Sequence, residues 1–223
     1  MKTTRQRFKD YDKLYFLPDS DIIIPPFLKK KIASLLKGDI LDIGCADGHK
    51  LKKLLSGSNS SKIRSIDAIE PSPLYKKAVR IFKNSKKVRV FHKEVKEILL
   101  YKKRYDIIML YEVIEHVPSP ENTIRVIKKL LKPGGLLILS TPNRLVYHIL
   151  CKLKGEKVDP THVSEMSYRE LRKLMNKNFK KNEFIGFFPL MFIIRKFPFL
   201  DIVNIIFRYL KCFSRTIYSF SSD

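Results

Sequence analysis

The sequence predicts an α/β fold with a doubly wound, mostly parallel β-sheet and helices on both of its faces. Short apolar segments alternate with amphipathic helical segments from residue 25 to about residue 180, which is the pattern of successive β-α units. The segment 105–110 is apolar at nearly every position, as expected for a strand covered on both faces. With 223 residues, the chain suffices for one such domain with appendages, or for two small domains.

The composition is that of a globular protein. Apolar residues make up 44% and aromatic residues 11% of the chain, which excludes a disordered or collagen-like protein. Cys45, Cys151 and Cys212 are odd in number and share no metal-binding spacing, so we expect reduced thiols. The longest uncharged stretches, 133–143 and 184–194, are too short to cross a bilayer as a helix. Because the charged N-terminal segment also lacks a secretory signal, we expect a cytoplasmic protein.

The net charge of +23 has two interpretations. A basic surface attracts polyanions such as nucleic acid, anionic lipid headgroups or phosphorylated substrates. The alternative is a compositional bias toward lysine and isoleucine, since the chain contains a single glutamine, Gln6.

The first predicted elements follow an N-terminal arm of mixed charge, residues 1–24. We expect a helix at 27–37, where Gly38 provides the stop, and then a short strand at 39–43. A glycine-rich turn and a second helix complete this first β-α unit. Residues 25–186 are predicted to form the main domain.

The β-α pattern then repeats. Residues 62–69 form a predicted strand, and the pair Ser72-Pro73 predicts an N-cap and first helical position for a helix ending near residue 82. A third strand is expected at 88–92 and a short helix at 94–100.

The second half of the domain continues with a strand at 105–110 and a helix at 121–131. The sequence Lys-Pro-Gly-Gly at 132–135 predicts a turn before a fifth strand at 136–140. A capping box formed by Ser167 and Glu170 predicts the start of a helix at 168–176, and 184–188 is a candidate sixth strand.

The C-terminal segment differs from the rest of the chain. Residues 187–223 are rich in phenylalanine, tyrosine and basic residues, and we expect a separate helical extension. Its predicted role is a lid, a dimer contact or a peripheral contact with the inner face of the membrane.

The turn after the first strand carries the first candidate binding residues. Asp42, Gly44, Ala46 and Gly48 have the spacing D-x-G-x-A-x-G at the carboxyl end of a strand, where such sheets bind ligands. A dinucleotide fingerprint would need glycine or alanine at His49, and the lysine of a P-loop is missing. The alternative is a glycine turn that binds nothing.

This turn, together with the segment 105–143, resembles class I S-adenosylmethionine (SAM)-dependent methyltransferases. Their motif is D/E-x-G-x-G-x-G, and YDIIMLYEVIEHVPSPENTIRVIKKLLKPGGLLILSTPN is similar to their fourth and fifth strands. The segment resembles the branch with quinone-biosynthesis O-methyltransferases and related small-molecule enzymes. The resemblance covers about 38–180 and implies a Rossmann-like seven-stranded sheet with SAM as cofactor.

The resemblance assigns the cofactor's methionine portion to the glycine turn. Asp42 would orient the turn and the methionine amino group, while the backbone of Gly44, Cys45 and Ala46 would pack against the cofactor. Ala46 departs from the family motif, because it places a methyl group where the middle glycine stands.

Further cofactor contacts are expected after the later strands. Glu70 ends the second strand about 20 residues beyond the turn, where a carboxylate accepts from ribose hydroxyls, whereas its competitor Asp67 lies inside the strand. The alternative for Glu70 is an exposed acid at a helix start. The resemblance places Glu94 at the adenine amino group and the Val95 N–H at the adenine ring. It places Tyr111 beside the methionine portion. The alternative for Glu94 is an acidic residue in the first turn of a helix.

The motif E-x-x-E-H supplies candidate catalytic residues and metal ligands. On a helix, Glu112, Glu115 and His116 would share one face and hold Mg²⁺ or another divalent cation. In many methyltransferases the same pair acts without metal, and His116 would then be a general base or line the pocket. His162 lies in a segment that often returns over the active site, as a pocket residue, a ligand or a residue without a role.

We therefore expect methyl transfer from SAM to a hydroxyl oxygen of a small-molecule or lipid-linked acceptor. The alternatives are an RNA methyltransferase, favoured by the charge, and a non-catalytic SAM-binding protein. A homo-oligomer is compatible with the sequence.

Overall fold

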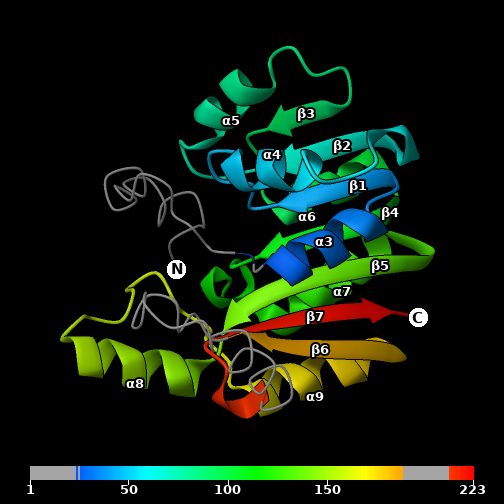
Figure 1. Cartoon of the computed structure of the whole chain (residues 1–223). Helices are drawn as coiled ribbons and strands as arrows, with labels where there is room; N and C mark the ends of the chain where they lie inside the picture. Colours follow the sequence, from blue (N-terminus) through cyan, green and yellow to red (C-terminus); the bar gives the residue numbers. More distant parts are fainter. Residues whose placement is uncertain (1–23, 25, 188–210) are drawn as a thin grey trace. The chain divides into compact units, whose positions relative to one another are not determined.

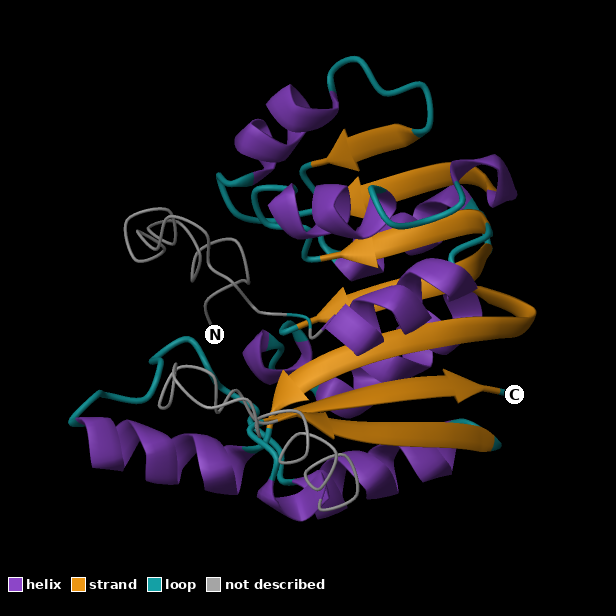
Figure 2. Cartoon of the chain, in the orientation of Figure 1, coloured by secondary structure: helices purple, strands orange, loops and turns teal. Residues whose placement is uncertain are grey.

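The structure, a computed structural model, describes residue 24 and residues 26–187 and 211–223. Its central feature is a seven-stranded sheet with the strand order β3-β2-β1-β4-β5-β7-β6. Figure 1 labels these elements, and Figure 2 separates strands from helices by colour. The predicted fold class is confirmed. The arm expected at 1–24 lies almost entirely outside the described residues.

The elements alternate along the chain as expected. The first part contains α3 (Pro26–Leu35), β1 (Gly38–Ile43), α4 (His49–Leu55), β2 (Ile63–Ile69), α5 (Tyr75–Phe82), β3 (Val88–Phe91), α6 (Val95–Ile98) and β4 (Tyr105–Tyr111). The second part contains the 3₁₀ helix η3 (Ile114–His116), α7 (Pro120–Leu130), β5 (Leu131–Pro142), α8 (Arg144–Lys154), α9 (Tyr168–Asn178), β6 (Lys181–Phe187), η5 (Lys211–Phe213) and β7 (Thr216–Ser222).

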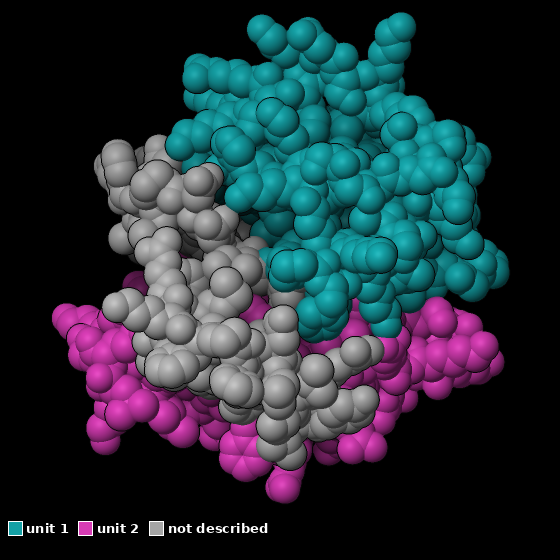
Figure 3. Space-filling view, viewed as in Figure 1, with its two compact units in different colours: residues 1–110, 125–136 teal, residues 111–124, 137–223 magenta. Residues whose placement is uncertain are grey.

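The chain divides into two compact units, residues 1–110 with 125–136 and residues 111–124 with 137–223 (Figure 3). In the first unit, β1 pairs in parallel with β2 and β4, and β2 pairs in parallel with β3. Its strands bury apolar side chains on both faces, among them Ile40, Leu41, Ile107 and Ile108, which explains their continuous hydrophobicity.

In the second unit, β7 runs antiparallel to both of its neighbours, β5 and β6. Leu139, Leu171, Met175 and Ile217 are fully buried there. Helix α9 begins at the predicted capping box, in which the Ser167 hydroxyl accepts from the Glu170 N–H and the Glu170 carboxylate accepts from the Ser167 N–H.

Three element starts differ from the predictions by two residues or more. Strand β6 begins at Lys181, three residues before the predicted start at 184. Helix α5 begins at Tyr75 instead of Pro73, because the Ser72 carbonyl and hydroxyl first close a tight turn with the N–H groups of Tyr75 and Leu74. Strand β5 begins at Leu131 and includes the segment expected to be a turn.

The helical prediction for the C-terminal segment is wrong for residues 216–222. These residues form β7, which hydrogen-bonds to β5 and β6 and completes the sheet. Residues 188–210 lie outside the described residues, so the lid, dimer and membrane roles of the extension stay predictions. Among the residues that the structure describes, no helix has the length and apolar character needed to span a membrane.

Candidate active site

The glycine turn after β1 is a left-handed stretch of backbone. Gly44, Ala46 and Gly48 have φ angles of 73°, 48° and 87°, a region that favours glycine. At Gly48 a side chain would also be crowded against α5, because a Cβ atom there would lie 3.0 Å from the Phe82 ring and 3.1 Å from Ala78. Ala46 is the one non-glycine residue of this turn in the left-handed region, which costs about 1–2 kcal/mol.

Glu70 connects the turn to the segment after β2. Its Oε2 accepts from the Ala46 N–H at 2.9 Å, and its Oε1 accepts from the Ser72 N–H at 2.8 Å. Only 7% of Glu70 is exposed, so the alternative of an exposed helix-start acid is wrong. Each carboxylate oxygen has a second lone pair, so this arrangement still allows acceptance from ribose hydroxyls.

Asp42 and Glu70 are two buried carboxyl groups of the first unit with raised pKa values. Burial raises the pKa of Asp42 to about 7; the nearby Glu70 carboxylate adds to the rise, while Lys50 opposes it. Burial also raises the pKa of Glu70, against the hydrogen bonds from Ser72 and Ala46. A ligand that brings a positive charge or hydrogen-bond donors would stabilise both groups in their ionised form.

Asp67, the competitor of Glu70, has a different task. It accepts hydrogen bonds from Arg89, Lys103 and Tyr105. Burial alone would raise the pKa of Asp67, but these hydrogen bonds hold it below its usual value. Asp67 therefore belongs to an ion-pair network inside the first unit.

Glu94 stands at the N-cap of α6. Its backbone N–H donates to Oε2 of Glu97 at 2.8 Å, and its own Oε2 lies 3.3 Å from Nζ of Lys96. The structure therefore shows the helix-start role that was the alternative for Glu94. Its contact with adenine, together with that of the Val95 N–H, stays a prediction.

The segment after β4 does not form the helix on which the three residues of the motif E-x-x-E-H would share one face. Glu112 has a left-handed φ of 52°, and the 3₁₀ helix η3 begins only at Ile114. The Glu112 N–H donates to the Ser140 carbonyl at 3.0 Å, and Oε1 of Glu112 accepts from the Ser140 hydroxyl at 2.7 Å. Glu112 therefore does not share a helix face with Glu115 and His116.

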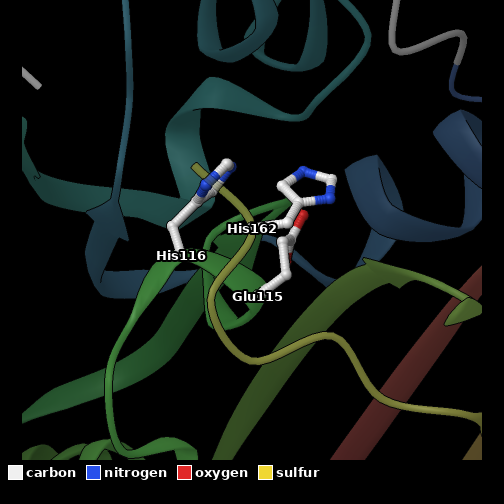
Figure 4. A group of neighbouring side chains, drawn as sticks. All are labelled: Glu115, His116 and His162. Carbon is white, nitrogen blue, oxygen red and sulfur yellow. The ribbon is translucent and has the colours of Figure 1, made fainter. Parts of the chain in front are cut away.

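A cluster of three side chains forms instead from Glu115, His116 and His162. One potential ligand atom from each residue lies within 4.8 Å of the other two. Figure 4 shows the side chains converging from the segment after β4 and from the loop before α9. Glu115 is fully buried, and the His116 and His162 rings make an edge contact with centroids 4.7 Å apart.

Backbone hydrogen bonds bring His162 to this cluster. The N–H groups of Val163 and Ser164 both donate to the Glu115 carbonyl at 2.9 Å. The Glu115 side chain is positioned from β5, because the Thr141 hydroxyl donates to its Oε2 at 3.0 Å. These bonds hold the loop that carries His162 against the segment that carries Glu115, and a functional role of His162 stays a prediction.

The partners of the two imidazole rings determine their tautomers. Nδ1 of His116 lies 3.2 Å from the Thr161 carbonyl, which can only accept, and 3.1 Å from the Thr161 hydroxyl. Nδ1 of His162 lies 2.6 Å from a carboxylate oxygen of Glu165. In the neutral form of each ring, these acceptors favour a proton on Nδ1 and a lone pair on Nε2, the tautomer that metal-ligating histidines use.

Thr161 and Glu165 were not predicted to be functional residues. The spacing His-x-x-Glu at 162–165 was the available signal, since a carboxylate commonly orients a ligating histidine. Tyr111, the remaining predicted cofactor contact, is buried at the end of β4. Its contact with the methionine portion stays a prediction.

Comparison with known proteins decides the family. A family model described as "Methyltransferase domain" matches residues 22–179, which is more than half of the chain. The chain belongs to this methyltransferase family. The resemblance seen in the sequence is thereby confirmed, and the glycine turn and the segment after β4 both lie within the matched residues.

Curated relatives match about half of the chain. The chain is 28% identical over 122 residues to a ubiquinone biosynthesis O-methyltransferase of Histophilus somni, covering 53% of this chain and 50% of the relative. It is 35% identical over 108 residues to the enzyme of that name from Xanthomonas oryzae, covering 47% and 43%. The chain thus spans about half the length, or slightly less, of the curated relatives it matches.

Solved structures agree on the fold. A small RNA methyltransferase, HEN1, has a TM-score of 0.67 at 21% identity, covering 88% of this chain and 24% of that one. The N-methyltransferase NodS from Bradyrhizobium japonicum, in complex with S-adenosylhomocysteine (SAH), has a TM-score of 0.59 at 14% identity and 99% coverage of both chains. At these identities the likeness concerns the fold alone.

Proposed function

We propose that the protein transfers a methyl group from SAM to a hydroxyl oxygen of a small-molecule or lipid-linked acceptor. The proposal rests on the match of about half of the chain to enzymes named ubiquinone biosynthesis O-methyltransferases. The family supports SAM as the methyl donor. The O-methyl specificity and the acceptor class come from these relatives' names.

The buried carboxyl groups of Asp42, in β1, and Glu70, after β2, suit the methionine and ribose portions of the cofactor. Asp42 would pair with the methionine ammonium group, which would relieve the cost of ionising a buried carboxyl. Glu70 would accept from the ribose hydroxyls while its bonds to Ala46 and Ser72 keep both loops in place. Adenine would bind near Glu94 and Val95.

The cluster of Glu115, His116 and His162 would activate the acceptor. Methyl transfer from a sulfonium needs an aligned nucleophile, an oxygen that has lost its proton and exclusion of water. The Nε2 lone pairs of the two histidines can accept this proton or bind a cation.

The donor set fits a divalent cation. Two imidazole nitrogens and one carboxylate, each histidine held through its Nδ1, form a ligand set with positions left open for a substrate oxygen. Mg²⁺ prefers oxygen ligands, whereas imidazole suits first-row transition metals, so the set favours an ion such as Mn²⁺ over Mg²⁺. When bound, such an ion would lower the pKa of the acceptor hydroxyl and orient its oxygen.

The test is methylation of an acceptor panel. The protein is incubated with SAM and one of three acceptors: a catechol carrying a prenyl chain, its monohydroxy analogue, or an RNA duplex. Mass spectrometry then measures the masses of the products. We expect a mass increase of one methyl group on the catechol alone. Transfer to RNA, or to no acceptor although SAM binds, would contradict the proposed acceptor class.

Two variants distinguish a specific loss of the cluster from a general loss of folding. Glu115→Gln should abolish transfer, because it removes the carboxylate of the cluster. Glu121→Gln is the matched control, since Glu121 is an exposed acid that pairs with Lys177 in the same unit. Equal activity of the two variants would exclude a role for the cluster.

A further inference from the structure

Asp159 closes a turn in the loop between α8 and α9. Its Oδ1 accepts two hydrogen bonds from Thr161, one from the backbone N–H at 2.8 Å and one from the hydroxyl at 2.6 Å. An aspartate that accepts from the N–H two residues later forms a tight turn of the backbone. The Asp159 N–H in turn donates to the Tyr147 hydroxyl on α8 at 3.2 Å. The turn therefore holds Thr161 in one position on the loop.

The turn presents two oxygen atoms of Thr161 to one nitrogen of His116. Nδ1 of His116 lies 3.1 Å from the Thr161 hydroxyl oxygen and 3.2 Å from the Thr161 carbonyl oxygen. Figure 4 shows the loop that carries His162 passing beside the His116 side chain. Asp159, Thr161 and His116 thus form a chain of hydrogen bonds, and all three residues belong to the second unit.

The direction of this chain follows from the single proton of the hydroxyl group. A threonine hydroxyl can donate once, whereas a carboxylate can only accept. The distance of 2.6 Å to Oδ1 of Asp159 is typical of a hydroxyl that donates to a carboxylate. The hydroxyl oxygen is then left to accept from Nδ1 of His116, which requires the proton of the neutral ring to lie on Nδ1.

Without an acceptor at residue 159, the same hydroxyl could turn around. It could donate to a lone pair on Nδ1 of His116, and the ring proton would then lie on Nε2. A ring nitrogen that carries a proton can neither bind a cation nor accept a further proton. The Thr161 carbonyl opposes this reversal, but it lies at nearly the same distance as the hydroxyl and is one of two competing partners.

We propose that Asp159 is a positioning residue that fixes the tautomer of His116 through the Thr161 hydroxyl. Its carboxylate accepts the hydroxyl proton and thereby keeps the lone pair of His116 on Nε2. The second ring of the cluster needs no such intermediary, because Glu165 contacts Nδ1 of His162 directly. The consequence for cation binding or proton transfer rests on the proposed function, whereas the tautomer can be measured independently of it.

The test is nuclear magnetic resonance of the histidine rings in the full chain, without SAM and without metal ions. Long-range ¹H–¹⁵N correlation spectra distinguish a protonated ring nitrogen from one with a lone pair, and His116→Gln assigns the signals. The spectra are recorded at about pH 9, well above the ordinary imidazole pKa of about 6.5, so that the rings are neutral. For the wild type we expect the His116 proton on Nδ1.

The Asp159→Ala variant should shift this equilibrium. We expect the ratio of the form with the proton on Nε2 to the form with the proton on Nδ1 to rise about fivefold or more, the change that corresponds to one hydrogen bond. Asp159→Asn retains an oxygen that can accept the same bonds, so it should keep the wild-type tautomer. Glu156→Ala is the matched control, since Glu156 is an exposed acid of the same loop that pairs with Lys154.

A double variant tests whether the effect passes through the hydroxyl. Thr161→Val removes the group that could turn around and leaves the carbonyl, which can only accept. Added to Asp159→Ala, it should return the ring proton to Nδ1 of His116. Damage to the turn would not be repaired by a further substitution, so this restoration separates the proposed role from a structural one. Circular dichroism verifies that each variant is folded.

Titration calorimetry with Mn²⁺ alone gives a second readout. We expect Asp159→Ala to lower Mn²⁺ affinity about tenfold and the double variant with Thr161→Val to regain most of it. A wild type that has the expected tautomer but binds no Mn²⁺ would contradict the proposed cation site and would still support the role of Asp159.

Three results would overturn the proposal. The first is a wild-type protein with the His116 proton on Nε2. The second is a folded Asp159→Ala variant that keeps the wild-type tautomer. The third is a double variant in which the proton stays where Asp159→Ala places it, because Asp159 would then act only by holding the turn.

Discussion

Oε1 of Glu165 lies 2.6 Å from Nδ1 of His162, and Oε2 of the same carboxylate contacts Nε2 of His148. One buried carboxylate thus connects a candidate ligand in the loop before α9 to helix α8. The Arg144 guanidinium, also on α8, donates to the Glu165 carbonyl at 3.1 Å. These bonds fix the orientation of the His162 ring independently of any bound cation.

Removal of the Glu165 carboxylate should weaken divalent cation binding. We expect Glu165→Ala to lower Mn²⁺ affinity about 10- to 100-fold, because His162 loses the partner that fixes its tautomer and orientation. Titration calorimetry with Mn²⁺ measures the effect, and SAM affinity should not change. Glu121→Gln is the control, and an unchanged Mn²⁺ affinity of Glu165→Ala would show that Glu165 does not position a ligand.

Glu70 should matter for cofactor affinity, and Asp67 should not. Glu70→Ala removes the proposed ribose acceptor and the bonds to Ala46 and Ser72, so SAM affinity should fall about tenfold or more. Asp67→Asn should lower the free energy of unfolding through its ion-pair network, with SAM affinity retained. Calorimetry and urea denaturation measure the two quantities. The ribose assignment fails if Glu70→Ala binds SAM as the wild type does.

The pKa of Asp42 predicts a pH-dependent affinity for SAM. Burial raises this pKa to about 7, so the carboxyl group of the free protein ionises only as the pH rises through that value. Because the methionine ammonium would pair with the ionised form, SAM affinity should decrease from about pH 8 to about pH 6. Asp42→Asn should bind more weakly and lose this dependence. An affinity of the wild type that is flat across this range would contradict the assigned role.

Ala46 is held in a conformation that glycine adopts without strain. Its φ of 48° predicts that Ala46→Gly raises the free energy of unfolding by up to about 1 kcal/mol, since relief of strain exceeds the added entropy of the unfolded chain. Urea denaturation measures this change. Ala33→Gly, within helix α3, is the control and should destabilise by about 1 kcal/mol. A loss of stability in Ala46→Gly would mean that the alanine methyl group contributes to packing.

The first half of the fold could be predicted because its signals are local. Apolar runs predicted β1, β2 and β4, and two glycines predicted the turn that follows β1. Both glycines have positive φ angles in the structure. Strand β7 lacks such a signal, because Ser219 and Ser221 are fully buried in it and break the expected apolar pattern. Its place in the sheet depends on antiparallel pairing with β5, a partner distant in sequence.

The candidate site could be predicted in composition but not in geometry. Glu115 and His116 were identified from a motif, yet the left-handed conformation of Glu112 has no sequence signal and removes that residue from the expected helix face. The position of His162 depends on the bonds from Val163 and Ser164 to the Glu115 carbonyl, which are long-range contacts. The fold, not the local sequence, thus selects the third member of the cluster.

Titration calorimetry of the wild-type protein with SAM and with SAH tests whether the two buried carboxyl groups belong to a cofactor site. We expect saturable binding of both ligands with dissociation constants of about 1–100 μM, stronger near pH 8 than near pH 6. Absence of binding to either ligand, by protein that circular dichroism shows to be folded, would contradict this assignment.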